Sequence, residues 1–315
     1  MDIQEKIASI DWHREPYGLY EPIAYTMVAG GKRVRPQLAM IACDLFGGAA
    51  QHIAPAAMAL EVFHNFTLLH DDVMDHALVR RGRPTVHVKW NENTAILSGD
   101  QMLIEAYKLL SGVPAEYLPK VLSMFNKMAT EICEGQQYDV DFETQERVAI
   151  EDYLKMIRLK TAVLLATALQ MGAYIAGAND EQQKSLYQLG INIGLAFQIQ
   201  DDILDVWGDP ATFGKAIGGD ISCNKKTFVL LTAMEMASEE DRRKLQTWME
   251  CLLEDNVDKI AAVTHIYNNI GVRTVCEKVV EEYTTAALAI LDSLPQNSAT
   301  NQLRQLVEKL HKRNV

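Results

Sequence analysis

The chain has 315 residues, 48% of them hydrophobic, which is enough for a sizeable buried core in one large domain or two. Its formal net charge of −12 argues against nucleic acid as the main partner. Five scattered cysteines without a CxxC pair predict reduced thiols in a cytoplasmic protein, and the sequence predicts neither a secretory signal nor a membrane span.

Helical periodicity runs along nearly the whole chain. Apolar residues recur at spacings of three and four, and convincing runs of strict alternation are missing, so the sequence predicts an all-α protein. At the N-terminal end, Gly30-Gly31 ends a first helical region. Pro36 stands where the next helix would start, and Gly47-Gly48 closes that helix.

Longer helices are predicted next. They run from about Pro55 to the residues near 71, from Glu92 to Leu110, from Pro114 to Asp139, onward from Ile150, and onward from Asp180. A basic loop, Arg80–Pro84, separates the first two, the chain breaks at Trp207–Pro210, and amphipathic helices continue from Lys225. No short repeat, low-complexity linker or shift in composition marks a boundary, so the sequence predicts one helical domain over residues 1–315.

Three carboxylates gather within five residues in the segment Leu69-His70-Asp71-Asp72-Val73-Met74-Asp75. A helix turns about 100° per residue, so Asp71 and Asp75 lie on one face, one turn apart, and Asp72 flanks them. Anions this close repel one another unless a cation joins them, and hard oxygen ligands of this kind suit Mg²⁺. An acidic helix face in solvent is the ordinary alternative for a single cluster.

The same spacing recurs in Asp201-Asp202-Ile203-Leu204-Asp205, again after an apolar run. The recurrence weakens the solvent-face alternative, because two DDxxD clusters at the ends of apolar helices are typical of two walls of one metal site. The sequence therefore predicts a magnesium site formed by Asp71, Asp72, Asp75, Asp201, Asp202 and Asp205.

Basic residues stand where phosphates would need them. The segment Gly30–Pro36 packs three cations beside two glycines, and further basic groups follow each acidic cluster. Taken singly, most are typical of a solvated surface, but the apolar neighbours of Lys160 predict burial, and a buried ammonium needs an anion. Together they predict two polyphosphate sites, one reached through metal and one by direct contact. The group comprises Lys32, Arg33, Arg35, His64, Arg80, Arg81, Lys160, Lys215, Lys225 and Lys226.

Two acidic clusters combined with two sets of basic residues suit a reaction in which a diphosphate group departs from a hydrocarbon. Metal ions held by two acidic clusters would neutralise charge while a C–O bond breaks. Because the helices above the clusters are apolar, the cation left behind is a hydrocarbon, and a dry pocket would keep water from quenching it. A second anion pocket without metal would hold the nucleophilic partner in position.

The chain resembles the trans-isoprenyl diphosphate synthases, or polyprenyl synthetases, of the short-chain type that makes geranylgeranyl or farnesyl diphosphate. The resemblance is carried, in order, by GGKRVRP, LLHDDVMDHALVRRGRPTVH, GQQYDVDF, RLKTAVLL, GLAFQIQDDILDV and FGKAIGGDISCNKKT. It implies a bundle of long, mostly antiparallel helices around a deep central cavity, in a cytoplasmic homodimer. It also implies three Mg²⁺ ions with diphosphate bound, with Mn²⁺ as a substitute.

The resemblance implies a role for each matching residue. The six aspartates form the metal set, with Asp71, Asp75 and Asp201 as direct ligands. The pocket for isopentenyl diphosphate comprises Lys32, Arg35, His64 and Arg81, and the allylic diphosphate is bound by Arg80, Lys160, Lys215 and Lys225. Thr161 and Gln198 lie beside the allylic cation. The implied head-to-tail reaction ionises the allylic diphosphate, attacks it with the isopentenyl double bond, and loses a proton to the departing diphosphate.

Product length depends, by the same resemblance, on Phe66 and Thr67, which precede the first cluster. A single aromatic side chain at Phe66 implies a stop at twenty carbons, whereas two aromatics would favour fifteen. An ideal helix places Phe66 about 140° from Asp71, with Thr67 and Leu68 nearer the aspartate face. An ordinary core position for Phe66 therefore remains the alternative.

Other functions explain less of the sequence. A terpene cyclase would share the fold and the first cluster, but it leaves the second DDxxD and the GGKRVRP segment unexplained. A helical metal-dependent phosphohydrolase would use the His70-Asp71 pair, which is a common dipeptide. A helical protein without enzymatic activity would need both acidic clusters and the basic groups to coincide by accident.

Overall fold

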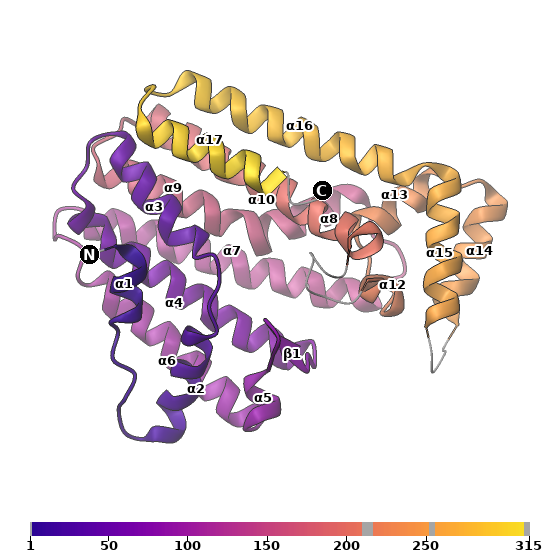
Figure 1. The fold of residues 1–315 in the computed structure, drawn as a ribbon, viewed down its shortest axis with the longest axis horizontal. Coiled ribbons are helices and arrows are strands. Elements are labelled where there is room, and N and C mark those ends of the chain that lie inside the picture. The colour runs from indigo at the N-terminus through magenta and orange to yellow at the C-terminus, as the bar shows by residue number, and fades with distance from the viewer. Residues whose placement is uncertain (1, 210–216, 252–255, 312–315) are drawn as a thin grey trace. The chain divides into compact units, whose positions relative to one another are not determined.

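The computed structural model describes residues 2–209, 217–251 and 256–311 (Figure 1). These residues are almost entirely helical, so the all-α prediction is confirmed. They group into two compact units. Unit 1 comprises Met1–Lys127, Thr167–Tyr187 and Pro295–Thr300, and unit 2 comprises Met128–Ala166, Gln188–Leu294 and Asn301–Val315. That one domain spans residues 1–315 stays a prediction.

Unit 1 is organised around α4, which packs along α6 and also contacts α3 (Figure 1). Its helices are α1 (Ile3–Ala8), α2 (Tyr17–Val28), α3 (Val34–Leu45), α4 (Ala50–Met74), α5 (Val86–Lys89) and α6 (Glu92–Leu110). The predicted bounds of α6 are confirmed, and the Asn91 side chain caps its start by accepting the Thr94 N–H at 2.9 Å.

Two predicted helix starts differ from the structure because a proline near the start of a helix does not have to be its first residue. α3 begins at Val34 rather than Pro36, and α4 begins at Ala50, so Pro55 lies inside it. Pro36 is the third residue of α3, among the first four N–H groups, which have no partner within a helix, whereas Pro55 is the sixth residue of α4 and removes one internal hydrogen bond. The predicted helix Pro114–Asp139 is instead α7 (Leu118–Thr144).

The segment predicted as a basic loop is an antiparallel hairpin of β1 (Val79–Arg80) and β2 (Arg83–Pro84). Its two turn residues both have positive φ, +53° at Arg81 and +72° at Gly82. This is the combination that a two-residue hairpin turn requires. The alternation rule misses it because each strand has only two residues.

Unit 2 contains the second acidic cluster. Its elements are α8 (Ile150–Ile157), the π-helix η1 (Arg158–Ala162), α12 (Gly219–Ser222), α13 (Phe228–Met236), α14 (Glu239–Glu250), α15 (Val257–Ile270) and α16 (Val272–Ser293). Both units include residues of α7, α9 (Val163–Ile175), α10 (Asp180–Trp207) and α17 (Ser298–His311). Apolar side chains surround α9, which is almost wholly buried. No described helix has a stretch long and apolar enough to cross a bilayer.

Candidate active-site residues in the two units

The first acidic cluster ends α4, in unit 1. Asp71 and Asp72 belong to its last turn, and the N–H of Asp75, the next residue after the helix, donates to the Asp71 carbonyl at 2.8 Å. The predicted spacing of one turn is therefore confirmed. Asp72 is buried and accepts a 2.6 Å hydrogen bond from Arg80 Nε, whereas Asp71 is half-buried and Asp75 exposed. Burial raises the pKa of Asp72, and the Arg80 charge opposes that rise.

The second acidic cluster lies in α10, in unit 2. Asp202 is 4% exposed and accepts hydrogen bonds from the Tyr153 hydroxyl at 2.5 Å and the Phe228 N–H at 3.0 Å. Burial, together with the nearby charge of Asp220, raises the pKa of Asp202 to about 7. Asp205 is also buried and accepts the Asp220 N–H at 2.9 Å, while Asp201 is half-buried.

The six predicted metal ligands therefore fall into two groups. Asp72, Asp202 and Asp205 are buried against groups of their own unit, and Asp71, Asp75 and Asp201 are more open. Within the described ranges, no three His, Cys, Asp or Glu side chains gather closely enough to hold a metal ion by themselves. Mg²⁺ usually takes one or two carboxylates and fills its other positions with water and substrate phosphate. The open carboxylates fit an ion that binds together with a diphosphate.

A buried ion pair supports the glycine-rich segment before α3. Arg33 donates from Nη1 to Glu61 Oε1 at 2.6 Å and from Nη2 to the Met27 carbonyl. Its backbone is left-handed, with φ +46°, directly before the first residue of α3. The Arg33 side chain thus binds the glycine-rich segment to α2 and α4. Sequence reasoning counted it among the phosphate-site cations and missed Glu61.

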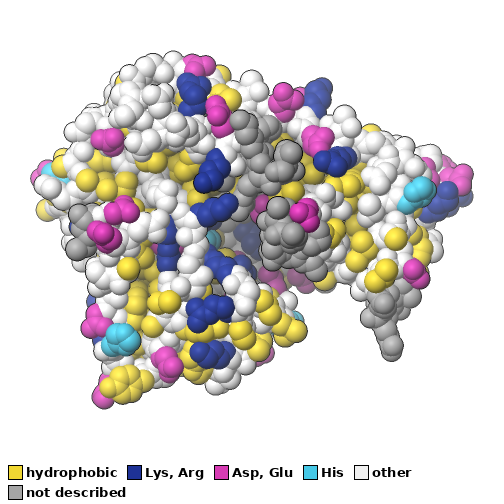
Figure 2. Space-filling model, in the orientation of Figure 1, with side chains coloured by type: hydrophobic (Ala, Val, Ile, Leu, Met, Phe, Trp, Pro, Cys, Tyr) yellow, Lys and Arg dark blue, Asp and Glu magenta, His cyan; other side chains and the backbone are white. Residues whose placement is uncertain are grey.

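Arg81 closes over the same segment from the hairpin. Its Nη1 donates to the Gly30 carbonyl, and a Cβ at Gly31 would lie 3.0 Å from its Nη2. Gly31 also has φ +136°, a backbone conformation that favours glycine. Figure 2 shows Lys and Arg side chains over the part of unit 1 that Figure 1 marks with α2 and β1. The structure therefore brings Arg81 to the GGKRVRP segment, as predicted.

Arg35 and His64 extend this cluster inward. Arg35 Nε is buried and has no hydrogen-bond partner among the described residues, and burial lowers the Arg35 pKa to about 10 despite the Glu61 carboxylate. Burial, with Arg35 and three further arginines nearby, also lowers the pKa of His64 well below its usual value. Lys32 stands exposed on the same segment. Such a cluster favours binding of an anion, which would supply the missing acceptor.

The depressed pKa of His64 predicts a loss of stability in acid. Below about pH 6.5 the unfolded chain protonates this histidine while the folded chain does not. The free energy of unfolding should therefore fall with pH by up to about 1.4 kcal/mol per unit. Urea unfolding at pH 7.5 and 5.5 would show a smaller fall for His64→Gln than for the wild type. The control His13→Gln, at an exposed histidine, should behave as the wild type, and equal falls in all three would contradict the prediction.

The predicted allylic-diphosphate lysines lie in unit 2. Lys160 is in η1, and π-helical turns occur frequently at functional sites. Its Nζ donates to Asp139 Oδ2 at 2.6 Å, so the anion expected for this half-buried lysine is a carboxylate of the chain itself. Burial would raise the pKa of Asp139, but the charges of Lys225 and Lys160 outweigh it and lower that pKa. The charges of both lysines therefore act on this one carboxylate.

Two further predicted residues meet beside Lys160. The Thr161 hydroxyl lies 3.3 Å from Gln198 Oε1, to which it can donate. The structure thus brings Thr161 and Gln198 together, as predicted. Lys215 lies outside the described residues.

Tyr25 on α2 anchors the hairpin that carries Arg80 and Arg81. The Arg83 guanidinium and the Lys89 ammonium lie 3.9 and 4.0 Å from its ring centre, and its hydroxyl donates to the Pro84 carbonyl at 2.9 Å. These contacts stabilise the hairpin through cation–π attraction and a hydrogen bond. Nothing in the sequence pattern singles out Tyr25, because its partners are 58 and more residues away.

Asp139 and Tyr153 are functional candidates that sequence reasoning did not assign. Asp139 lies within GQQYDVDF, a segment quoted for the resemblance, and a search for the anion demanded by buried Lys160 could have found it. Tyr153 offers no such signal, since its hydroxyl meets Asp202 49 residues away.

Phe66 lies on the side of α4 that faces α6. Its ring centre is 4.8 Å from that of His70 and 5.4 Å from that of Phe63. His70 in turn reaches α6, with Nε2 3.1 Å from the Ile96 carbonyl. Phe66 thus belongs to an aromatic cluster of unit 1 that runs from Phe63 to His70, directly before Asp71. The roles of Phe66 and Thr67 in product length stay predictions.

The chain is similar to known proteins over most of its length. The profile of the polyprenyl synthetase family matches residues 16–270. A geranylgeranyl diphosphate synthase from Methanosarcina mazei is 40% identical over 260 residues, which are 78% of this chain and 80% of that protein.

Solved structures agree with the fold. A crystal structure of a geranylgeranyl pyrophosphate synthase has a TM-score of 0.93 and 43% identity, and it covers 99% of this chain and 97% of that one. A crystal structure of the polyprenyl synthase from Caulobacter crescentus CB15, complexed with calcium and isoprenyl diphosphate, has a TM-score of 0.86 and 28% identity, covering 99% and 93%.

Proposed function

Since this chain belongs to the polyprenyl synthetase family, we propose that it condenses isopentenyl diphosphate with an allylic diphosphate, head to tail, to give geranylgeranyl diphosphate. The observation that carries the proposal is that each unit combines a DDxxD cluster with its own set of cations. Arg35 and Arg81 gather beside the neutral His64 in unit 1, and Lys160 and Lys225 gather in unit 2. Two diphosphate substrates require two sets of basic side chains.

Asp71, Asp75 and Asp201 are our candidates for direct metal ligands. Mg²⁺ held there would neutralise charge on the diphosphate and make it a better leaving group. The buried aspartates instead position neighbouring groups through hydrogen bonds. Asp72 accepts from Arg80, and Asp202 accepts from Tyr153 and from Phe228, the first residue of α13. The number of ions, three, and the use of Mn²⁺ stay predictions.

The chain's own groups account for the rest of the reaction. Lys160 and Lys225 bind and orient the allylic diphosphate, and the oxygens of Thr161 and Gln198 stabilise the allylic cation formed when its C–O bond breaks. Arg35, His64 and Arg81 hold isopentenyl diphosphate so that its double bond forms the new C–C bond. The proton then released goes to the departing diphosphate, so no side-chain base is needed.

We also propose that the protein is a homodimer. Ile96, Leu97, Ile104 and Tyr107 of α6 are 41%, 60%, 54% and 40% exposed. On a helix of about 100° per residue they fall within about 100° of one another, which makes one continuous apolar face. A second copy of the chain is the partner that the family resemblance favours.

All five cysteines are free thiols. A cytoplasmic location stays a prediction.

Product length should respond to Phe66. Replacing Phe66 by alanine opens space one turn before Asp71 and is expected to shift the product toward longer chains. Mass analysis of the products formed with a farnesyl starter measures the shift. Val140→Ala is the control, because this side chain is exposed, and its products should match the wild type. An unchanged distribution in Phe66→Ala would remove Phe66 from the wall of the product cavity.

Incubation of the purified chain with Mg²⁺, labelled isopentenyl diphosphate and each allylic starter in turn tests the function. A prenyl diphosphate of twenty carbons supports the proposal, and a stop at fifteen or a longer product keeps the reaction but changes the length. Cyclic hydrocarbon would indicate a terpene cyclase, and phosphate release without chain growth would indicate a phosphohydrolase.

A further inference from the structure

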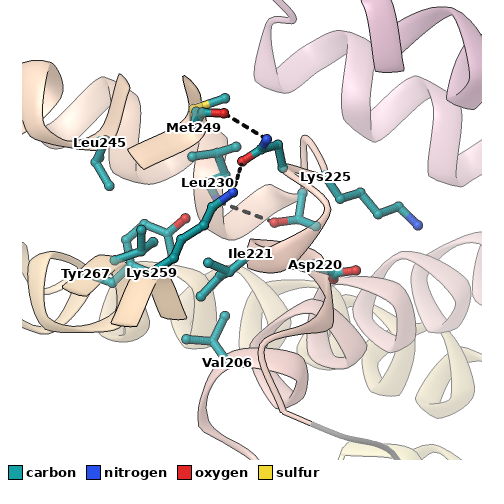
Figure 3. Close-up of a pocket in the computed structure, with 12 residues that line it drawn as sticks. Val206, Asp220, Ile221, Lys225, Leu230, Leu245, Met249, Lys259 and Tyr267 are labelled. Atoms are coloured by element: carbon teal, nitrogen blue, oxygen red, sulfur yellow. Dashed lines mark hydrogen bonds between the residues drawn. The ribbon is translucent and has the colours of Figure 1, made fainter. Parts of the chain in front are cut away.

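Lys259 is a buried lysine to which the proposed reaction assigns no task. It lies on α15, is 2% exposed, and lines a pocket of unit 2 with Val206, Leu230 and Tyr267 (Figure 3). Burying an ammonium group costs free energy unless hydrogen bonds replace its water. The groups that receive those hydrogen bonds therefore indicate what Lys259 stabilises.

The Lys259 ammonium binds the short segment that follows α12. Its Nζ donates to Asn224 Oδ1 at 2.7 Å and lies 3.5 Å from the Ser222 carbonyl (Figure 3). Ser222 is the last residue of α12, where carbonyl groups have no partner within the helix. Asn224 has a left-handed backbone, with φ +54°, and its Nδ2 donates to the Met249 carbonyl at 2.9 Å. Asn224 is thus held by α14 and α15 together.

Lys225 follows directly after this strained residue. Its side chain is exposed and extends away from Lys259 in Figure 3. On the other side, Lys226 Nζ donates to the carbonyls of Phe142 and Glu143, at 2.5 and 3.2 Å, at the C-terminal end of α7. The backbone on either side of Lys225 is therefore fixed by a neighbouring lysine or by Lys259.

We propose that Lys259 is a positioning residue for Lys225. The inference rests on the proposed function, in which Lys225 binds the allylic diphosphate. By holding the Asn224 side chain, Lys259 maintains the left-handed turn that directs Lys225 toward the Asp139–Lys160 pair. Lys259 itself touches no substrate. Its effect is confined to the allylic diphosphate, because the residues assigned to isopentenyl diphosphate belong to unit 1.

A role in stability alone would give a different result. Loss of a buried hydrogen-bonded lysine lowers the folded fraction, and this lowers the apparent kcat for every substrate without changing either KM. A positioning role raises the KM for the allylic diphosphate and leaves the KM for isopentenyl diphosphate unchanged. The two KM values therefore distinguish the explanations.

Steady-state kinetics of Lys259→Met provides the test, since methionine keeps the length of the side chain and removes its donors. The KM for the allylic diphosphate should rise about tenfold or more, and the KM for isopentenyl diphosphate should stay within about twofold. Lys278→Met is the matched control on α16, where the lysine side chain is 75% exposed, and both KM values should equal the wild type. If Lys259→Met does not fold, Asn224→Ala removes the same hydrogen bond and should show the same split.

Unchanged KM values in Lys259→Met, or an equal rise in both, would overturn the inference while leaving the proposed function intact. Absence of any prenyl product from the wild type would overturn the proposed function, and this inference with it.

Discussion

Replacing Asp201 by asparagine should lower kcat by about a hundredfold or more while changing the free energy of unfolding by less than about 0.5 kcal/mol. The side chain is half-buried and is one of the three open carboxylates. In the proposed function this charge binds metal, so its loss weakens metal binding, whereas the amide keeps the shape of the side chain. Turnover at saturating Mg²⁺ and urea unfolding measure the two effects, and Asp71→Asn should behave likewise.

Asp202→Asn, one residue along, is the matched control. Its Oδ2 accepts from both the Tyr153 hydroxyl and the Phe228 N–H, and its Oδ1 lies 3.4 Å from the donor Gln198 Nε2, so the NH₂ group of an asparagine would face a donor in either orientation. We expect the free energy of unfolding to fall by about 1–3 kcal/mol. Near-normal turnover in Asp201→Asn would refute its role as a ligand. A loss of stability in Asp201→Asn as large as that in Asp202→Asn would show that both carboxylates are structural.

The second large effect is expected from a single methyl group at Gly135, on α7. A Cβ there would lie 2.8 Å from the Cα of Lys160 and closer still to its backbone nitrogen. Backbone cannot move aside as a flexible side chain can, so Gly135→Ala must displace η1 and, with it, Lys160 and Thr161. We expect a loss of about 1–3 kcal/mol in unfolding free energy and at least a tenfold fall in kcat/KM for the allylic diphosphate.

Gly18→Ala provides the comparison for Gly135→Ala. Gly18 lies in α2, and nothing comes within 4 Å of an added Cβ. Alanine should stabilise that helix by about 0.5–1 kcal/mol and leave kinetics unchanged. Full activity in Gly135→Ala would mean that η1 does not set the position of Lys160.

The features predicted well from sequence are those that depend on local pattern. The bounds of α6 follow from Asn91 and the apolar period, and the spacing of Asp71 and Asp75 follows from helix geometry alone. A cluster of basic residues at Gly30 and Gly31 could be predicted because cations beside glycines are visible in the chain itself, and its role as a polyphosphate site stays a prediction. The division of the aspartates into buried and open could not, because it depends on Tyr153 and Phe228, which are 49 and 26 residues from Asp202.

The π-helix and the hairpin were missed for related reasons. η1 differs from an α-helix only in its hydrogen bonds, and the packing of Gly135 against Lys160 is invisible in the periodicity of either helix. The hairpin strands are too short to alternate. In both places the tertiary contact, and not the local sequence, determines the backbone.

The left-handed residues have a consequence for engineering. Arg33, His76, Arg81 and Asn224 are the described non-glycine residues with positive φ, and each is next to, or is, a residue proposed to bind metal or diphosphate. These are points of local frustration, where the backbone preferred by the residue conflicts with the native conformation. Glycine at Arg81 would relieve the conflict but would delete the guanidinium that the anion pocket needs. A search for heat-stable variants should therefore find a gain at Arg81 that comes at the expense of catalysis, which makes Arg81 a position to exclude from stabilising libraries.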